Sequence, residues 1–162
     1  MEELFAPPAE NWRSLAPAYL RLRRLSVVLN YGLPTMALVL LIGWVWSWWA
    51  ALVVGVGGVT VLMIRLLRQP ALVRSWGYTE RHTDLCIKHG LWFRSMVIVP
   101  YGRMQAIEIE AGPLAQHFGV TTVTLVTASA SSNAQIPGLN PQVAEQLRDR
   151  MLAMAERKDA GL

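Results

Sequence analysis

Three side chains that can bind a metal or take part in acid–base chemistry alternate along one short stretch: His82, Asp84 and Cys86. Imidazole, carboxylate and thiolate groups are all zinc ligands. On an extended strand, however, His82 and Cys86 are about 13 Å apart at the backbone. Zinc holds its ligands at about 2.0–2.3 Å, so three residues in line cannot converge on one ion. We expect no metal site here; a His82–Asp84 pair completed by the remote His117 is the less favoured alternative.

Other catalytic patterns are equally weak. The serines of ASASSNAQ (Ser129, Ser131 and Ser132) lie in a polar loop rather than in a nucleophile elbow. The glycines of GVGG lie in an apolar run and not in a phosphate-binding loop. A single cysteine excludes an internal disulfide and a cysteine-based zinc cage, as expected in a reducing compartment. We therefore predict that the protein is not an enzyme and holds no cofactor.

The longest continuous feature of the sequence is an uncharged, mainly apolar stretch. From Leu25 to Ile64, forty consecutive residues carry no charge or histidine. About 20 helical residues cross a bilayer, so this stretch is long enough for two crossings. Four tryptophans lie near its middle, where a turn at the membrane–water boundary would place them. The sequence predicts a transmembrane helical hairpin over residues 25–67, with helices at about 25–45 and 48–67. A buried hairpin in a soluble protein is disfavoured, because the remaining chain is too short to cover it.

The flanking charges predict the orientation of this hairpin. Arginines precede the first helix and follow the second, whereas the connecting turn has no charge. Because lysine and arginine are enriched on cytoplasmic flanks, we expect a multi-pass protein of the bacterial plasma (inner) membrane with both termini in the cytoplasm. The predicted membrane-interface anchors are Trp44, Trp46, Trp48, Trp49, Arg21, Arg23, Arg24, Arg65 and Arg68.

Three features inside the spans have structural consequences. Pro34 should kink the first helix, since it removes a backbone donor. Asn30 needs a hydrogen-bond partner, which we expect on the neighbouring helix. Ala51, Gly55 and Gly58 form a small-residue stripe that should let the two helices approach closely.

The chain's formal net charge of +4 is uneven. Residues 1–70 hold six Lys/Arg against three Asp/Glu, whereas residues 71–162 hold nine against eight. The excess therefore lies beside the membrane, where it sets topology and attracts anionic lipid headgroups. The remainder lacks the basic stripe that binding to phosphates requires, so we exclude nucleic acid as a partner.

Residues 1–24 are predicted to be a cytoplasmic N-terminal segment in which Pro17 opens a helix. Residues 70–157 are predicted to form a cytoplasmic β domain of six or seven strands closed by a helix. Its expected strands are WGYTER, TDLCIKHG, LWFRSMVIVP, MQAIEIEAG, VTTVTLVTA and AQIPG, separated by turn residues. In the final segment, Asn140 is a plausible N-cap, and Val143, Leu147, Met151 and Met154 define one apolar helix face.

The stretch VPYGRMQAIE contains the first candidate contact residues. Pro100 should end a strand, and Gly102 suits the following turn. Arg103 and Gln105 would then share one strand face. The structural interpretation pairs Arg103 with a carboxylate and Gln105 with the turn backbone, whereas the functional one makes them a surface for lipid or protein. Lys88, His89 and Arg94 around the preceding hairpin are candidates of the same kind.

Taken together, the two membrane helices, VPYGRMQAIE, FGV before a threonine-rich strand, IPGL and the terminal helix resemble the bacterial pleckstrin-homology (PH) domain of the YdbS-like membrane-flanked family. The resemblance implies a PH-like split β-barrel on the cytoplasmic membrane face, and a larger paralogue as a possible partner. We expect a module that docks partner proteins in a membrane complex, with self-association also possible; the alternative is a lipid-headgroup-contacting module. Neither interpretation assigns catalytic residues.

Overall fold

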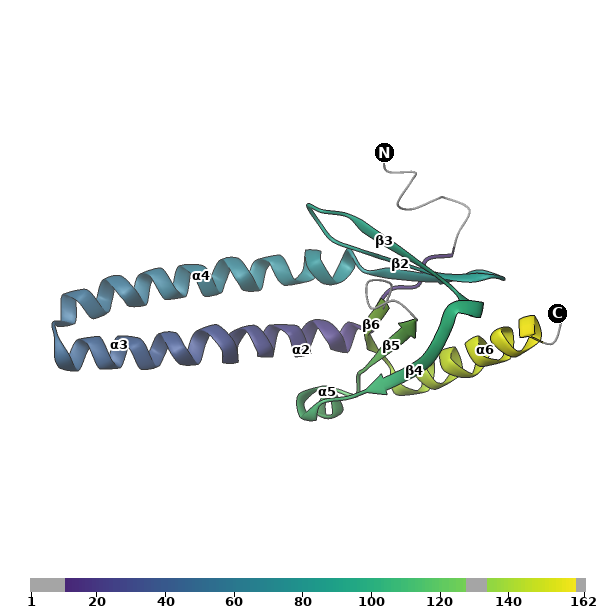
Figure 1. Cartoon of the computed structure of the whole chain (residues 1–162). Coiled ribbons are helices and arrows are strands. Elements are labelled where there is room, and N and C mark those ends of the chain that lie inside the picture. Colours follow the sequence, from purple (N-terminus) through teal and green to yellow (C-terminus); the bar gives the residue numbers. More distant parts are fainter. Residues whose placement is uncertain (1–10, 128–133, 160–162) are drawn as a thin grey trace. The chain divides into compact units, whose positions relative to one another are not determined.

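The computed structural model describes residues 11–127 and 134–159, with side chains as far as Ala155. The serines at 129, 131 and 132 lie outside these described residues. The chain divides into two compact units. One is a helical unit, Leu20–Pro70, and the other combines the N-terminal segment up to Tyr19 with everything from Ala71 onward. Figure 1 draws both units and labels most of their helices and strands.

The helical unit is an antiparallel hairpin whose helices are longer than the sequence predicts. The first helical stretch consists of α2 (Pro17–Val27), the π-helical turn η1 (Val28–Gly32) and α3 (Leu33–Val45). The second is α4 (Trp48–Arg74), which continues through Pro70. Both stretches are long and apolar enough to cross a membrane by length and composition. Residues 25–45 alone would span about 31 Å at 1.5 Å per residue, close to the thickness of a hydrocarbon core.

A π-helical turn, Val28–Gly32, ends two residues before Pro34, the residue at which the sequence predicts a kink. A proline removes its own N–H and crowds the carbonyl four residues earlier, and a wider turn accommodates both changes. The prediction for Asn30 was wrong. Its amide donates to the Ser26 carbonyl oxygen on the same helix at 2.8 Å. A polar side chain can hydrogen-bond to the carbonyl oxygen four residues earlier on its own helix, so no interhelical partner is needed.

The small-residue stripe packs the two helices as predicted. A Cβ atom added to Gly58 would collide with the Thr35 side chain. One added to Gly55 would lie 3.5 Å from Val39 Cγ2. Ala51 is buried even though most of the hairpin's side chains are exposed. The glycines therefore let the helix backbones approach closely, which is how transmembrane helices pack without a hydrophobic driving force from water.

The second unit contains two antiparallel three-stranded sheets among the residues that the structure describes. The first has the order β1-β2-β3 and the second the order β4-β5-β6. A 3₁₀ turn, η2 (Tyr101–Arg103), joins β3 to β4, and a short helix, α5 (Pro113–His117), joins β4 to β5. The strands are β1 (Gly77–Glu80), β2 (Asp84–His89), β3 (Ser95–Pro100), β4 (Met104–Glu110), β5 (Thr121–Thr127) and β6 (Ala134–Leu139).

Helix α6 (Pro141–Asp159) closes this unit as the sequence predicts. The Asn140 side chain accepts a hydrogen bond from the Gln142 N–H at 3.3 Å, so Asn140 caps the helix. Leu147 and Met151 are fully buried on its apolar face. They join one core that draws residues from both sheets, among them Leu85, Ile87, Val99, Val123, Leu125 and Ile136.

The residues just before α2 belong to this β unit, whereas the sequence predicts a separate segment over residues 1–24. Arg13 and Tyr78 exchange both backbone hydrogen bonds, at 2.9 and 3.1 Å, which extends the first sheet beyond β1. The Ala16 N–H donates to the Gly138 carbonyl oxygen at 2.9 Å. Helix α2 then begins at Pro17, as predicted. The chain therefore contacts both sheets before it enters the hairpin.

Candidate functional site

Three of the predicted contact residues gather at the β2–β3 hairpin. The register pairs Lys88 with Met96 and His89 with Ser95, so Arg94 lies just beyond the last pair. The Lys88 ammonium lies 4.0 Å from the centroid of the Trp12 ring. His89 stacks on Trp76 with ring centroids 4.7 Å apart and an interplanar angle of 21°. The strand ends thus hold Lys88 and His89 against aromatic rings, while Arg94 is exposed.

The other two predicted residues lie at the opposite end of β3. Strand β3 has six residues, so its ends are about 16 Å apart. Arg103 is in the 3₁₀ turn and not on a strand face with Gln105, which corrects the prediction. In the pairing of β4 with β5, Met104 opposes Thr127 and Ala106 opposes Val126, so Gln105 is the extra residue of a β-bulge. A bulge re-aims a side chain and breaks the period-2 alternation on which the prediction relied.

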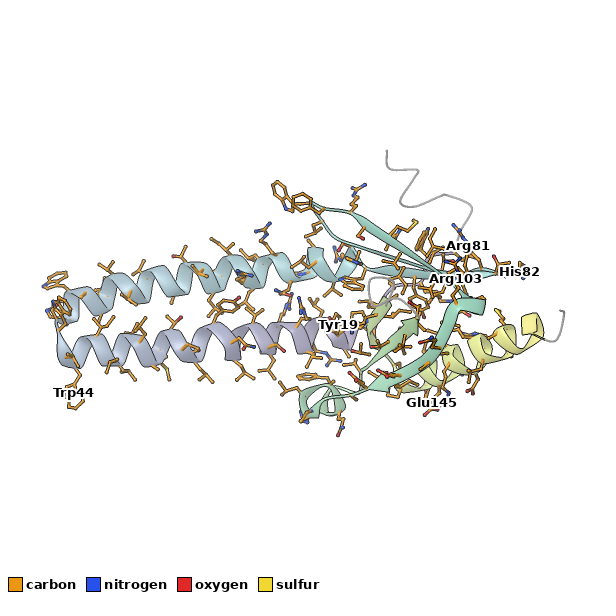
Figure 2. The ribbon with its side chains drawn as sticks, viewed as in Figure 1. Tyr19, Trp44, Arg81, His82, Arg103 and Glu145 are labelled. Carbon is orange, nitrogen blue, oxygen red and sulfur yellow. The ribbon has the colours of Figure 1, made fainter. Side chains whose placement is uncertain are left out.

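Neither internal interaction predicted for Arg103 and Gln105 is present in the described part of the chain. Both side chains are exposed. Figure 2 shows Arg103 near Arg81 and His82, at the end of the unit where β1 turns into β2. The candidates therefore form two separate surfaces, which we call the hairpin end (Lys88, His89, Arg94) and the bulge end (Arg103, Gln105).

The hairpin end includes two residues that sequence reasoning missed. Trp92 is 82% exposed and Phe93 is 93% exposed. The sequence predicts a strand from Leu91, but β3 begins at Ser95, and residues 91–94 form the tip of the hairpin. Gly90, with φ +106°, allows this turn, because a Cβ atom there would collide with the Phe93 carbonyl oxygen. A glycine directly before an apolar tripeptide that is followed by arginine was the available signal.

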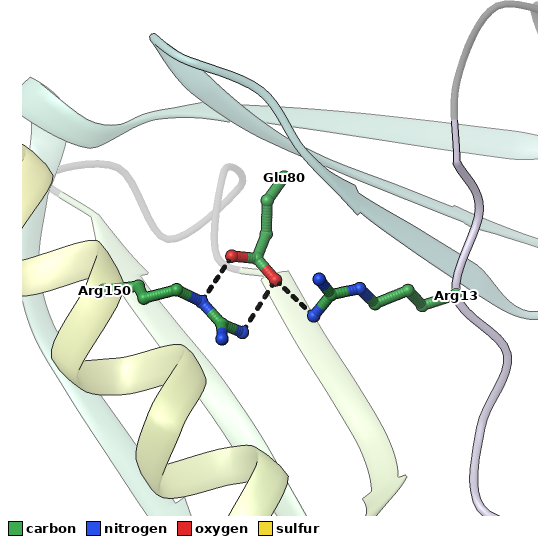
Figure 3. Close-up of polar contacts among 3 residues, drawn as sticks. All are labelled: Arg13, Glu80 and Arg150. Carbon is green, nitrogen blue, oxygen red and sulfur yellow. Dashed lines mark hydrogen bonds and ion pairs between the residues drawn. The ribbon is translucent and has the colours of Figure 1, made fainter.

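An ion-pair cluster joins three distant parts of the β unit (Figure 3). Glu80, at the end of β1, accepts two hydrogen bonds from the Arg150 guanidinium on α6, at 2.8 and 2.9 Å. Arg13, in the segment before α2, donates to the same carboxylate at 2.9 Å. The Glu80 side chain is only 12% exposed. Paired charge-assisted bonds of this geometry are strong, so Glu80 clamps the N-terminal segment and α6 to the first sheet.

Tyr101 lies beside this cluster and is almost fully buried. Its hydroxyl has no hydrogen-bond partner among the residues that the structure describes. Burial, followed by the negative charges of Glu80 and Asp84, raises the pKa of Tyr101 to about 12. The phenol is therefore kept neutral, which suits a packing role better than acid–base chemistry.

The alternating side chains of His82, Asp84 and Cys86 do not converge. His82 is exposed, whereas Cys86 is fully buried and its thiol donates to Asp84 Oδ1 at 3.8 Å. Within residues 11–127 and 134–159, no group of three histidine, cysteine, aspartate or glutamate side chains is arranged to hold a metal ion. His117, the remote partner of the alternative pair, ends α5 next to Phe118, against which its ring packs edge-on.

Comparison with known proteins decides the family. Residues 27–155 match the bacterial PH domain family. The chain belongs to this family. It is also 30% identical over 119 residues to the UPF0699 transmembrane protein YdbS of Bacillus subtilis (strain 168), a match covering 70% of this chain and 71% of the relative. No solved structure matches.

For this bacterial PH protein, the comparison confirms the fold class predicted from the sequence. The matched region begins inside the first helical stretch, so it takes in the hairpin as well as the β unit. The described structure agrees: two long apolar helices precede two three-stranded sheets and a C-terminal helix. The protein is thus a membrane-associated protein with a bacterial PH-like domain.

The predicted interface anchors lie at the two ends of the hairpin. Trp44, labelled in Figure 2, is 88% exposed at the turn between α3 and α4. The other three tryptophans of the cluster, Trp46, Trp48 and Trp49, are exposed there as well. On the far side of the apolar stretch, the Arg65 guanidinium lies 5.1 Å from the Tyr31 ring centroid. The remaining predicted anchors are Arg21, Arg23, Arg24 and Arg68, all of them exposed.

Proposed function

We propose that this protein holds its PH-like domain at the cytoplasmic face of the bacterial plasma membrane, where the domain docks partner proteins of a membrane complex. In this proposal α2–α3 and α4 cross the membrane, both termini are cytoplasmic, and the tryptophan turn faces outward. The arginines at the open end of the hairpin support this orientation, because such charges mark cytoplasmic flanks. The protein acts as an interaction module and not as an enzyme.

The observation that carries the proposal is the shortness of both chain connections. Only Ser75 and Trp76 separate α4 from β1. At the other connection, α2 begins directly after Ala16, whose backbone N–H donates a hydrogen bond to the Gly138 carbonyl oxygen. A domain connected in this way stays beside the bilayer. Its effective concentration near other membrane proteins is therefore high, and weak contacts suffice for docking.

The bulge end is the surface that we assign to the protein partner. Arg103 and Gln105 are exposed, and no described residue satisfies their polar groups. An arginine at an exposed surface is a common anchor of protein interfaces. A larger paralogue of the same family, or a second copy of this chain, is the partner that the family resemblance suggests.

A site-specific crosslinking experiment tests this assignment in cells. A photo-crosslinking amino acid at Gln105 should yield a discrete protein adduct. The same amino acid at Glu145, an exposed position on α6, is the matched control and should yield none. The absence of an adduct from Gln105, or the same adducts from both positions, would contradict the assignment.

Lipid contact is the second candidate function, and the hairpin end favours it. Contact with the headgroup layer requires apolar side chains flanked by cations. Trp92, Phe93 and Arg94 meet this requirement and lie together at the tip of the hairpin.

A further inference from the structure

The tip of the β2–β3 hairpin carries the most exposed aromatic pair of the described β unit. Trp92 and Phe93 are 82% and 93% exposed. The core of the unit is built without them. Large aromatic side chains are enriched where one side of a protein meets an apolar or interfacial partner. Since folding of the unit makes no use of the two rings, they are available to a surface outside the chain.

The tip is held out from the sheet by its own strands. Strands β2 and β3 are in register over all six residues, from Asp84–Pro100 to His89–Ser95. The turn is closed by Gly90, with φ +106°. Just before it, His89 is stacked on Trp76. The position of the aromatic pair is thus set by paired backbone and ring contacts.

The tip lies at the end of the sheet where the chain arrives from α4. The register pairs Gly77, the first residue of β1, with Lys88. Trp76 stacks on His89. The last turn of α4, Ala71–Arg74, belongs to the same compact unit and ends three residues before β1. The aromatic pair therefore lies at the end of the first sheet where the chain enters β1.

The charged side chains nearest to the tip along the chain have one sign. No aspartate or glutamate occurs between Asp84 and the tip or between the tip and Glu108, whereas Lys88 lies just before the tip and Arg94 lies in it. Arg74 adds a further exposed cation at the end of α4. An aromatic pair among cations is the chemistry of interfacial membrane segments, in which rings enter the acyl boundary and cations meet anionic headgroups.

We propose that Trp92 and Phe93 insert into the headgroup layer of the membrane that the helical hairpin crosses, with Arg94 and Lys88 facing anionic lipid headgroups. This inference rests on the membrane topology of the proposed function. It makes the hairpin tip a third membrane contact besides the two helices. The tip then fixes the rotation of the PH-like domain and leaves the bulge end free for a protein partner.

Fluorophore quenching in reconstituted full-length protein tests the insertion. Cys86 is replaced by alanine, and an environment-sensitive fluorophore is attached through Leu91→Cys beside the aromatic pair. The vesicles contain phosphatidylethanolamine and phosphatidylglycerol, with brominated lipids as membrane quenchers and iodide as the aqueous quencher. The label is expected to be quenched by brominated lipid and shielded from iodide. A label at Glu145→Cys on α6 is expected to show the opposite.

A label at Val56→Cys, within α4, separates failure of the inference from failure of the topology. Lipid quenching at Val56 but not at Leu91 would overturn the insertion of the β2–β3 tip, while the transmembrane helical hairpin would still be placed in the membrane. Quenching at neither position would overturn the proposed membrane anchoring and the insertion with it. Shielding of Leu91 from both quenchers would mean that protein covers the tip, which also overturns the insertion.

The aromatic side chains themselves are tested in the Leu91→Cys background. Replacing both Trp92 and Phe93 with serine should lower lipid quenching at position 91 to the level of the Glu145 control. Replacing two exposed leucines elsewhere in the unit, Leu114 and Leu152, should leave it unchanged. Full quenching in the serine variant would refute the role of the two rings.

Discussion

Replacing Gly138 with alanine tests how the segment before α2 is fixed to the β unit. Gly138 has φ +68°, and an added Cβ atom would collide with the Tyr19 ring. The left-handed backbone costs a non-glycine residue about 1–2 kcal/mol. Forcing extra atoms into a packed contact costs about 1–3 kcal/mol more. The variant should therefore lose about 2–5 kcal/mol of unfolding free energy.

Gly119 supplies the matched control. It has φ +63°, but no atom lies within 4 Å of its added Cβ. Gly119→Ala should therefore lose only the backbone contribution, about 1–2 kcal/mol. The reduced entropy of the unfolded chain is the same in both variants, so it cancels in their difference. That difference measures the contact with Tyr19.

The buried thiol of Cys86 provides the assay. It is the chain's single cysteine and is fully buried, so it reacts with a maleimide only when the β unit opens. Labelling the detergent-solubilised protein across a urea series gives the unfolding free energy by linear extrapolation. Equal losses for the two alanine variants would refute the packing of Tyr19 on Gly138. A further check is the Tyr19→Ala background, in which the additional cost at Gly138 should disappear.

Three further variants test other contacts. Tyr101→Phe should weaken the pH dependence of the unfolding free energy between pH 10 and about 12. With Tyr101 present, the unfolded chain has released the phenolic proton in this range while the folded chain still holds it, so stability falls as pH rises. Urea midpoints measured across this range report the difference. Glu80→Gln should cost about 1.5–3 kcal/mol by Cys86 labelling, whereas Asp149→Asn, at an exposed ion pair, should cost about 0–1 kcal/mol. Gly58→Ala should lower the highest temperature up to which the detergent-solubilised protein remains monodisperse, because the added Cβ atom collides with Thr35 of α3. Gly57→Ala should leave this temperature unchanged, since no atom lies within 4 Å of its added Cβ. An unchanged pH slope, equal effects of the two charge variants, or equal effects of the two glycine variants would each contradict the corresponding contact.

The features that the sequence predicts well are those that depend on local periodicity and composition. The uncharged run from Leu25 to Ile64 predicts the helical hairpin, because forty predominantly apolar residues without a charge are twice the length that one bilayer crossing needs. The apolar face and the Asn140 cap predict α6 within a residue of its observed start. Alternation of Ile107 and Ile109 with glutamates marks β4 for the same reason.

The features that the sequence does not predict depend on contacts between distant residues or on turn geometry. Glu80 meets Arg13 and Arg150 across 67 and 70 positions of the sequence, and no local pattern encodes such a contact. The bulge at Gln105 shifts the strand register by one residue, which period-2 counting cannot anticipate. Trp92 resembles a core strand residue in the sequence. Only the start of β3 at Ser95 makes it a tip residue.

Our central claim is that two helices cross the membrane and keep the PH-like domain in the cytoplasm. The accessibility of single cysteines to a membrane-impermeant maleimide tests this claim most directly. Cysteines are introduced one at a time at Ser47, in the tryptophan turn, and at Glu145, on α6, in a Cys86→Ala background. Our account predicts that the reagent labels Ser47→Cys on intact spheroplasts and reaches Glu145→Cys only after lysis. Labelling of Glu145→Cys on intact spheroplasts, or protection of Ser47→Cys until lysis, would contradict it.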